Sequence, residues 1–172
     1  PLQNRAFRGK TRRNKTMIKI LFVCHGNICR SPMAEFVMKD LVKKAGLADQ
    51  FEIASAATSR EEIGNPVHRG TRNKLKQYGI SVDGKYAVQM TSADYRYYDY
   101  IIAMERYNLR NMERFVHGDP DHKVHLLLDF TDRKGDIADP WYTGNFDETY
   151  DDVLEGCQGL LSETIAYYDH KC

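Results

Sequence analysis

Two cysteines, an arginine and a serine lie close together near the start of the chain. Residues 24–31 have the sequence CHGNICRS and directly follow the apolar run IKILFV. A cysteine thiolate is a nucleophile, and the planar guanidinium of Arg30 can hold two oxygens of a phosphate-like group. Gly26 and Asn27 are residue types that tolerate the positive φ of a tight turn. The spacing predicts a loop that curls around an anion, with Cys24 beside it.

The hydrophobic pattern predicts the elements that must position this loop. Four apolar runs are typical of buried strands, at 18–24, 51–57, 99–104 and 123–130. Three segments with helical spacing alternate with them, at 32–46, at 68–80 and from residue 147 onward. This alternation predicts an α/β fold: a small doubly wound, Rossmann-like sheet of four parallel strands with helices on both faces.

In such a sheet the loop lies where ligands usually bind, at the carboxyl end of a strand. The backbone N–H groups of residues 25–30 are expected to converge at the amino terminus of the following helix, which favours an anion. The same helix terminus and Arg30 favour the thiolate form of Cys24. Ser31 can donate a hydrogen bond to that sulfur. We therefore expect a thiolate beside an anion-binding loop.

Other uses of the cysteines explain less. A zinc knuckle needs a second ligand pair, and neither Cys157 nor Cys172 has a nearby partner. Four unevenly placed cysteines do not suit a disulfide scaffold and fit a reducing cytosol better. A core cysteine at a strand end is common, but it leaves the convergence of Cys24, Arg30 and Ser31 unexplained.

Charge is distributed unevenly along the chain. Residues 1–16 contain six Lys and Arg and no Asp or Glu; without those six, 19 basic residues remain against 24 acidic ones, a net charge of −5. We expect a leader added for expression at 1–16 and a single domain at 17–172. The alternative is a natural arm that binds nucleic acid or anionic lipid, which the acidic body and the lack of interleaved aromatic residues disfavour. No window is long enough for a membrane span and no secretory leader is evident, so we expect a cytoplasmic protein with neither a nucleic-acid nor a membrane partner.

The motif C-x4-C-R-S-P after the first strand resembles that of the low-molecular-weight protein tyrosine phosphatases. The resemblance runs from Met17 to about Leu161 and includes SAATS at 55–59, IGNP at 63–66 and DPWYTGNFDETY at 139–150. It implies a single phosphatase domain over 17–172. It also implies that protein phosphotyrosine and small aryl phosphates are hydrolysed through a cysteinyl-phosphate, without metal or cofactor. The expected partners are phosphotyrosine-containing proteins and inorganic phosphate, as product and inhibitor, and the chain is expected to be a monomer or to self-associate weakly.

Phosphoryl transfer from a phenol needs a nucleophile, stabilisation of the equatorial oxygens and a proton for the leaving oxygen. Cys24 is the expected nucleophile, and Arg30 is expected to stabilise the charge. The phosphate-binding set is expected to comprise the loop residues His25, Gly26, Asn27, Ile28, Cys29, Arg30 and Ser31.

Two Asp-Pro pairs are candidates for the general acid. Asp119 lies in a polar segment without aromatic residues, whereas Asp139 is followed by Trp141 and Tyr142, flat side chains suited to flank a phenyl ring. The placement of the acid in the resembling family agrees with Asp139. We expect Asp119 only to form a turn.

The substrate rim is expected to comprise Ile28, Glu61, Glu62, Trp141 and Tyr142. Family members often carry an aromatic residue at the cleft rim near the position of Glu61 and Glu62, where this chain has a carboxylate pair, and its peptide preference is therefore expected to differ. They also often have a tyrosine at the position of Trp141. Arginine-directed relatives have a threonine at the position that corresponds to Ile28. A protein-arginine phosphatase is therefore the first alternative function.

Further alternatives are weaker. An arsenate reductase needs additional redox cysteines near the site, and a non-catalytic phospho-binding module would be expected to lose Cys24 or Asp139. The histidines and aspartates between 117 and 125 have irregular spacing and are expected to be solvated rather than to bind a metal. The tyrosines between 95 and 100 are expected to pack rather than to stack on bases.

Cys29 has no role in phosphoryl transfer. An exposed thiolate is oxidised readily, first to a sulfenic acid and then irreversibly. Because Cys29 lies on the same curled loop, its Cα could fall within the ~7 Å of Cys24 that a disulfide allows. The hypothesis is that Cys29 is a redox partner that traps the reversible stage; the alternative is a small buried residue packed under the loop.

Overall fold

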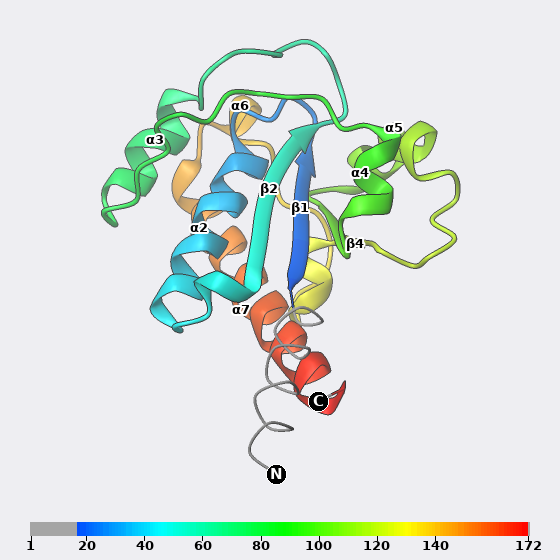
Figure 1. The fold of residues 1–172 in the computed structure, drawn as a ribbon. Coiled ribbons are helices and arrows are strands. Elements are labelled where there is room, and N and C mark those ends of the chain that lie inside the picture. The colour runs from blue at the N-terminus through cyan, green and yellow to red at the C-terminus, as the bar shows by residue number, and fades with distance from the viewer. Residues whose placement is uncertain (1–16, 172) are drawn as a thin grey trace.

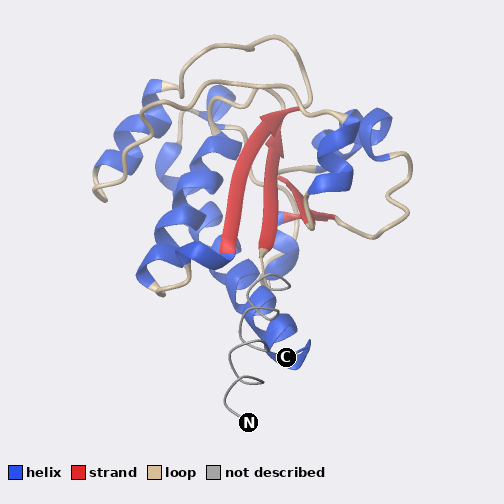
Figure 2. Ribbon diagram, viewed as in Figure 1, coloured by secondary structure: helices blue, strands red, loops and turns tan. Residues whose placement is uncertain are grey.

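The computed structural model describes residues 17–171, so the predicted leader at 1–16 lies outside the described residues. Four strands form one sheet, β1 (Ile18–Cys24), β2 (Phe51–Ala57), β3 (Tyr100–Ala103) and β4 (Val124–Leu126). All neighbouring strands are parallel, in the order β2-β1-β3-β4 (Figure 2). The predicted four-stranded parallel sheet is confirmed.

Helices cover both faces of the sheet, as predicted. One side carries α2 (Arg30–Lys44), α3 (Arg69–Lys76) and the long α7 (Phe146–Lys171), and the other carries α4 (Ser92–Tyr97) and α5 (Arg106–Val116) (Figure 1). Three short pieces complete the elements: 3-10 turns at Ala48–Gln50 and Leu127–Phe130, and α6 (Pro140–Thr143). None of the helices within 17–171 has the length and apolarity needed to cross a bilayer.

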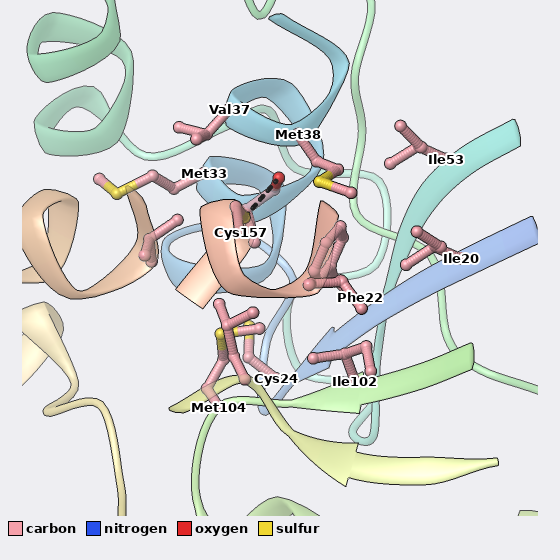
Figure 3. Close-up of a cluster of buried hydrophobic side chains, with 14 of the residues drawn as sticks. Ile20, Phe22, Cys24, Met33, Val37, Met38, Ile53, Ile102, Met104 and Cys157 are labelled. Carbon is pink, nitrogen blue, oxygen red and sulfur yellow. Dashed lines mark hydrogen bonds between the residues drawn. The ribbon is translucent and has the colours of Figure 1, made fainter. Parts of the chain in front are cut away.

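The alternation of side chains along β1 determines where Cys24 points. Ile20, Phe22 and Cys24 belong to the core beneath α2 and α7, while Leu21 and Val23 belong to the core beneath α4 and α5. Figure 3 shows the Cys24 side chain among the buried residues of the core beneath α2 and α7. The position of its sulfur is therefore fixed by the packing of the sheet.

The carboxyl end of β1 is also the switch point of the sheet. The chain passes from β1 through α2 to β2 on one side, whereas β3 lies on the other side of β1. Such a reversal of strand order opens a crevice at the carboxyl ends of the strands. Residues 25–29 run from β1 into α2 at this edge, as the sequence predicted.

The sequence prediction was wrong at the end of one strand and missed three helices. The strand expected at 123–130 ends at Leu126, because Leu127 and Leu128 both pack into the core under α2 and α7. Consecutive residues of a strand would point to opposite faces of the sheet. The helix expected at 68–80 is shorter, spanning Arg69–Lys76, and α4, α5 and the short α6 were not predicted.

Candidate active site

The loop at 25–29 is held in shape by the buried side chain of Asn27. This residue has a φ of 59°, in the left-handed region that asparagine tolerates better than most residues. Its amide nitrogen donates to Ser31 Oγ at 2.7 Å and to Ser55 Oγ at 2.9 Å. Its amide oxygen accepts from the backbone N–H of Val88 at 3.2 Å. Asn27 therefore joins the loop to α2, to β2 and to the segment before α4.

A buried charged pair extends this support. Ser55 donates to Glu35 of α2 at 2.6 Å, and Glu35 is only 4% exposed. Lys85 donates to the backbone oxygen of Ser55 at 2.8 Å and lies 3.7 Å from the Glu35 carboxylate. Burial lowers the pKa of Lys85, and the attraction to Glu35 opposes that shift. Because a buried carboxylate needs partners, these contacts fix Glu35 beneath the loop.

Ser31 is positioned to assist the sulfur of Cys24. The two atoms, Cys24 Sγ and Ser31 Oγ, are 3.0 Å apart. Because Ser31 Oγ already accepts a hydrogen bond from Asn27, its own hydrogen is available to the sulfur. Ser31 therefore supplies a hydrogen-bond donor directly beside the sulfur of Cys24.

Arg30 crosses the base of the site and is only 1% exposed. One guanidinium nitrogen donates to Glu105 and to the backbone oxygen of Ile137, both at 2.8 Å, and the other donates to Asp139 at 3.3 Å. Burial alone would lower the pKa of Arg30, but the nearby Cys24, Asp139 and Glu105 raise it above its usual value. The guanidinium is thus a fixed positive charge next to Cys24.

Asp139 faces Arg30 from the start of α6. One carboxylate oxygen accepts from the backbone N–H of Trp141 at 3.0 Å, and the other accepts from Arg30. Trp141 rests edge-on against His68, with ring centroids 5.6 Å apart, yet it remains 58% exposed, and Tyr142 is 84% exposed. Two exposed aromatic side chains therefore follow the carboxylate at the mouth of the site.

These residues surround one cavity of about 380 Å³, within the usual range of small-ligand pockets, about 300–1,000 Å³. Its wall combines loop residues, acids and aromatic side chains: Cys24, His25, Gly26, Ile28, Cys29, Arg30, Glu61, Glu62, Glu105, Tyr107, Asp139, Trp141 and Tyr142. The structure brings together the residues expected for catalysis and for the rim. Asn27 and Ser31 do not line the cavity and instead support the loop from behind.

The structure gives Asp119 a local role. Its carboxylate accepts from Tyr95 Oη at 2.7 Å and from the backbone N–H groups of Lys123 and Val124 at 2.8 and 3.1 Å. It does not line the cavity. Within residues 17–171, no cluster of three or more His, Cys, Asp or Glu side chains is arranged to hold a metal ion.

Sequence reasoning missed Glu105 and Tyr107, which line the cavity after β3. A signal for Glu105 was available, because it directly follows an expected strand, and the carboxyl ends of parallel strands meet at one edge of the sheet. The support from Glu35 and Lys85 was also missed. Nothing in the spacing of these two residues connects them to the loop.

Comparisons with known proteins agree on one family. The family model described as "Low molecular weight phosphotyrosine protein phosphatase" matches residues 19–168. A low molecular weight protein-tyrosine-phosphatase of Bacillus subtilis, YfkJ, is 42% identical over 148 residues, covering 85% of this chain and 95% of that protein. The crystal structure of YfkJ covers 88% of this chain and 96% of its own, at 40% identity and a TM-score of 0.85.

Two further solved structures are similar. The low molecular weight protein tyrosine phosphatase SP-PTP of Streptococcus pyogenes has 46% identity and a TM-score of 0.76, covering 86% of this chain and 93% of its own. The Drosophila arginine phosphatase DARP has 32% identity and a TM-score of 0.78, covering 85% of this chain and 97% of its own.

Proposed function

Because the chain belongs to the low molecular weight phosphotyrosine protein phosphatase family, we propose that it hydrolyses phosphotyrosine in proteins, and small aryl phosphates, through a phosphoryl group carried on Cys24. The Cys24 thiolate attacks phosphorus, the bond from phosphorus to the phenolic oxygen breaks, and Asp139 gives its proton to that oxygen. Asp139, now a carboxylate, then takes a proton from water as the water attacks the cysteinyl-phosphate. Inorganic phosphate leaves and Cys24 is restored.

The loop and Arg30 stabilise the charge that develops on the phosphoryl oxygens. The N–H groups of residues 25–30 supply fixed dipoles, and the guanidinium supplies a positive charge that needs no reorganisation. The Ser31 hydroxyl, 3.0 Å from Cys24 Sγ, is placed to donate a hydrogen bond to that sulfur. The observation that carries the proposal is the placement of Cys24, Arg30 and Asp139 around one cavity. The Arg30 guanidinium donates a hydrogen bond to the Asp139 carboxylate at 3.3 Å.

Membership in the family implies phosphoprotein substrates. We propose further that residues 17–172 act as one phosphatase domain in the cytoplasm and that inorganic phosphate binds as product and inhibitor. The net charge of −5 outside the first 16 residues supports the absence of a nucleic-acid or anionic-membrane partner. We expect a monomer or weak self-association.

Turnover of matched phosphotyrosine and phosphoarginine peptides distinguishes the proposed function from its first alternative. We expect a kcat/KM for phosphotyrosine well above that for phosphoarginine, because Ile28 and the aromatic pair after Asp139 offer flat apolar contacts for a phenyl ring. Comparable values for the two substrates would contradict the proposed substrate. A chelator should leave the rate unchanged, and a metal requirement would contradict the mechanism.

The substitution Ile28→Thr tests the role of the rim in that choice. The backbone of Ile28 is anchored, since its oxygen accepts from the N–H of His68 at 2.8 Å, so only the side chain should change. A hydroxyl at this position can bond the polar nitrogen of phosphoarginine, while the loss of apolar bulk weakens contact with a phenyl ring. We expect the ratio of phosphotyrosine to phosphoarginine kcat/KM to fall about tenfold. An unchanged ratio in the variant would show that the Ile28 side chain does not determine the choice between the two substrates.

Cys29 is proposed as the redox partner of Cys24. Burial, together with the nearby Cys24 and Asp139, raises the pKa of Cys29 to about 12, so Cys24 is the thiol expected to react first with peroxide. The Cys24 sulfenic acid would then condense with the Cys29 thiol, forming a disulfide and releasing water, and dithiothreitol would reverse it.

We expect Cys29→Ser to keep most activity but to recover poorly with dithiothreitol after peroxide exposure. Peptide mapping of the oxidised wild type should show Cys24 joined to Cys29. Cys157→Ser is the matched control, since Cys157 is buried in the core, and it should recover as the wild type does. If Cys29→Ser fully recovered its activity and the wild type showed no crosslink, Cys29 would have only a packing role.

A further inference from the structure

The wall of the cavity carries more negative than positive charge. Four acidic side chains line it, Glu61, Glu62, Glu105 and Asp139, against the single arginine Arg30. Glu105 and Asp139 are already paired with Arg30. Glu61 and Glu62 are the two acids left over, and in the described part of the chain neither carboxylate lies within 4 Å of a Lys or Arg nitrogen.

Contacts with and beside the phosphate-binding loop hold these two carboxylates in place. His25, the first residue of the loop, lies with its Nε2 3.0 Å from the Glu61 carboxylate. The side-chain stem of Glu62 lies against Gly26, where an added Cβ would come within 3.2 Å of Glu62 Cγ. Asn65 donates to the Glu62 carboxylate at 2.6 Å. Both acids are thus oriented on the cavity wall before any substrate binds.

A phosphotyrosine seated in the loop brings its neighbouring residues across this wall. A Lys or Arg side chain next to the phosphotyrosine would meet Glu61 and Glu62, whereas an Asp or Glu would be repelled by them. We propose that this phosphatase selects phosphotyrosine sites flanked by basic residues, with Glu61 and Glu62 as the specificity-determining pair. The inference rests on the proposed function and adds the class of peptide that the enzyme prefers.

The kinetic form of the selectivity follows from where the charges lie. In the proposed mechanism, Glu61 and Glu62 do not touch the reacting atoms, so they attract a basic peptide equally in the ground state and in the transition state. Uniform binding of this kind lowers KM and leaves kcat unchanged. Because both carboxylates are near solvent, salt should screen the attraction, whose range falls from about 10 Å at 0.1 M ionic strength to about 3 Å at 1 M.

The test uses three phosphotyrosine peptides that differ only in the residues flanking the phosphotyrosine, which are Arg, Ala or Glu. For the wild type at low salt we expect kcat/KM to fall in that order. The Arg peptide should have a kcat/KM about 3–10-fold above that of the Ala peptide, because its KM is lower. This difference is the size expected for two exposed ion pairs. The advantage should fall towards one as salt approaches 1 M. Equal values for the Arg and Ala peptides at low salt would overturn the inference.

The double variant Glu61→Gln with Glu62→Gln assigns the selectivity to these residues. Its Arg-to-Ala ratio should fall close to one, and because both peptides are measured on the same protein, a change in overall activity cancels from the ratio. Glu163→Gln is the matched control, an exposed glutamate on α7 outside the cavity wall, and should keep the wild-type ratio. A wild-type ratio in the double variant would overturn the inference. Failure of the wild type to hydrolyse any phosphotyrosine peptide would instead contradict the proposed function.

Discussion

Replacing Cys24 with serine is expected to abolish turnover of p-nitrophenyl phosphate while leaving oxyanion binding intact. The hydroxyl of serine is a far weaker nucleophile than a thiolate, and the loss of a covalent nucleophile typically costs about 10⁴-fold or more in kcat. The loop amides and Arg30 remain, so the variant should still bind inorganic phosphate, which titration calorimetry measures. Substantial turnover by Cys24→Ser would show that Cys24 is not the nucleophile.

The control for this change is Cys157→Ser. Cys157 is fully buried between α7 and α2, close to the backbone oxygen of Ala34, and burial raises its pKa (Figure 3). It has no access to a substrate. The control should therefore keep turnover, which separates the loss of a nucleophile from the general effect of replacing a thiol.

Replacing Asp139 with asparagine is expected to slow hydrolysis of phenyl phosphate by about 10²–10⁴-fold. Asparagine keeps an oxygen that can accept from the N–H of Trp141, so the start of α6 should persist while the proton donor is lost. The defect should be much smaller for p-nitrophenyl phosphate, whose leaving group needs little protonation. Steady-state rates across a series of aryl phosphates with leaving groups of different basicity measure this difference.

Asp119→Asn is the matched control for Asp139→Asn. Its carboxylate holds the turn before β4 through Tyr95, Lys123 and Val124, so stability is expected to fall while the dependence of rate on the leaving group stays that of the wild type. If Asp119→Asn removed that dependence and Asp139→Asn kept it, the assignment of the general acid would be reversed.

The parts of the fold that follow local rules could be predicted from the sequence. β1 and the loop at 25–29 are specified by an apolar run, two turn-forming residues and a helix start, all within about twenty residues. The tail helix follows from a stripe of apolar residues, several of which are buried against α2. In these segments local propensity, hydrophobic pattern and tertiary packing favour the same structure.

The parts that depend on distant contacts could not be predicted. Arg30 is paired with Glu105, 75 residues away, and Lys85 reaches the Glu35–Ser55 pair from a segment with no distinctive pattern. The end of β4 was mispredicted for the same reason. Leu127 and Leu128 leave the strand because both are needed in the core under α7, where Gly156 lets Leu127 approach closely.

In the proposed mechanism, the phosphoryl group passes through the sulfur of Cys24. The most direct test is to mix Asp139→Asn with p-nitrophenyl phosphate, quench within the first turnover and locate the phosphate by peptide fragmentation. The variant suits the test because the leaving group departs without an acid while the water step, which needs Asp139 as base, is slowed. The proposed mechanism predicts one S-linked phosphate on Cys24, and none on Cys29, that decays as inorganic phosphate appears. Turnover without any phosphoenzyme, or with the phosphate on another residue, would contradict it.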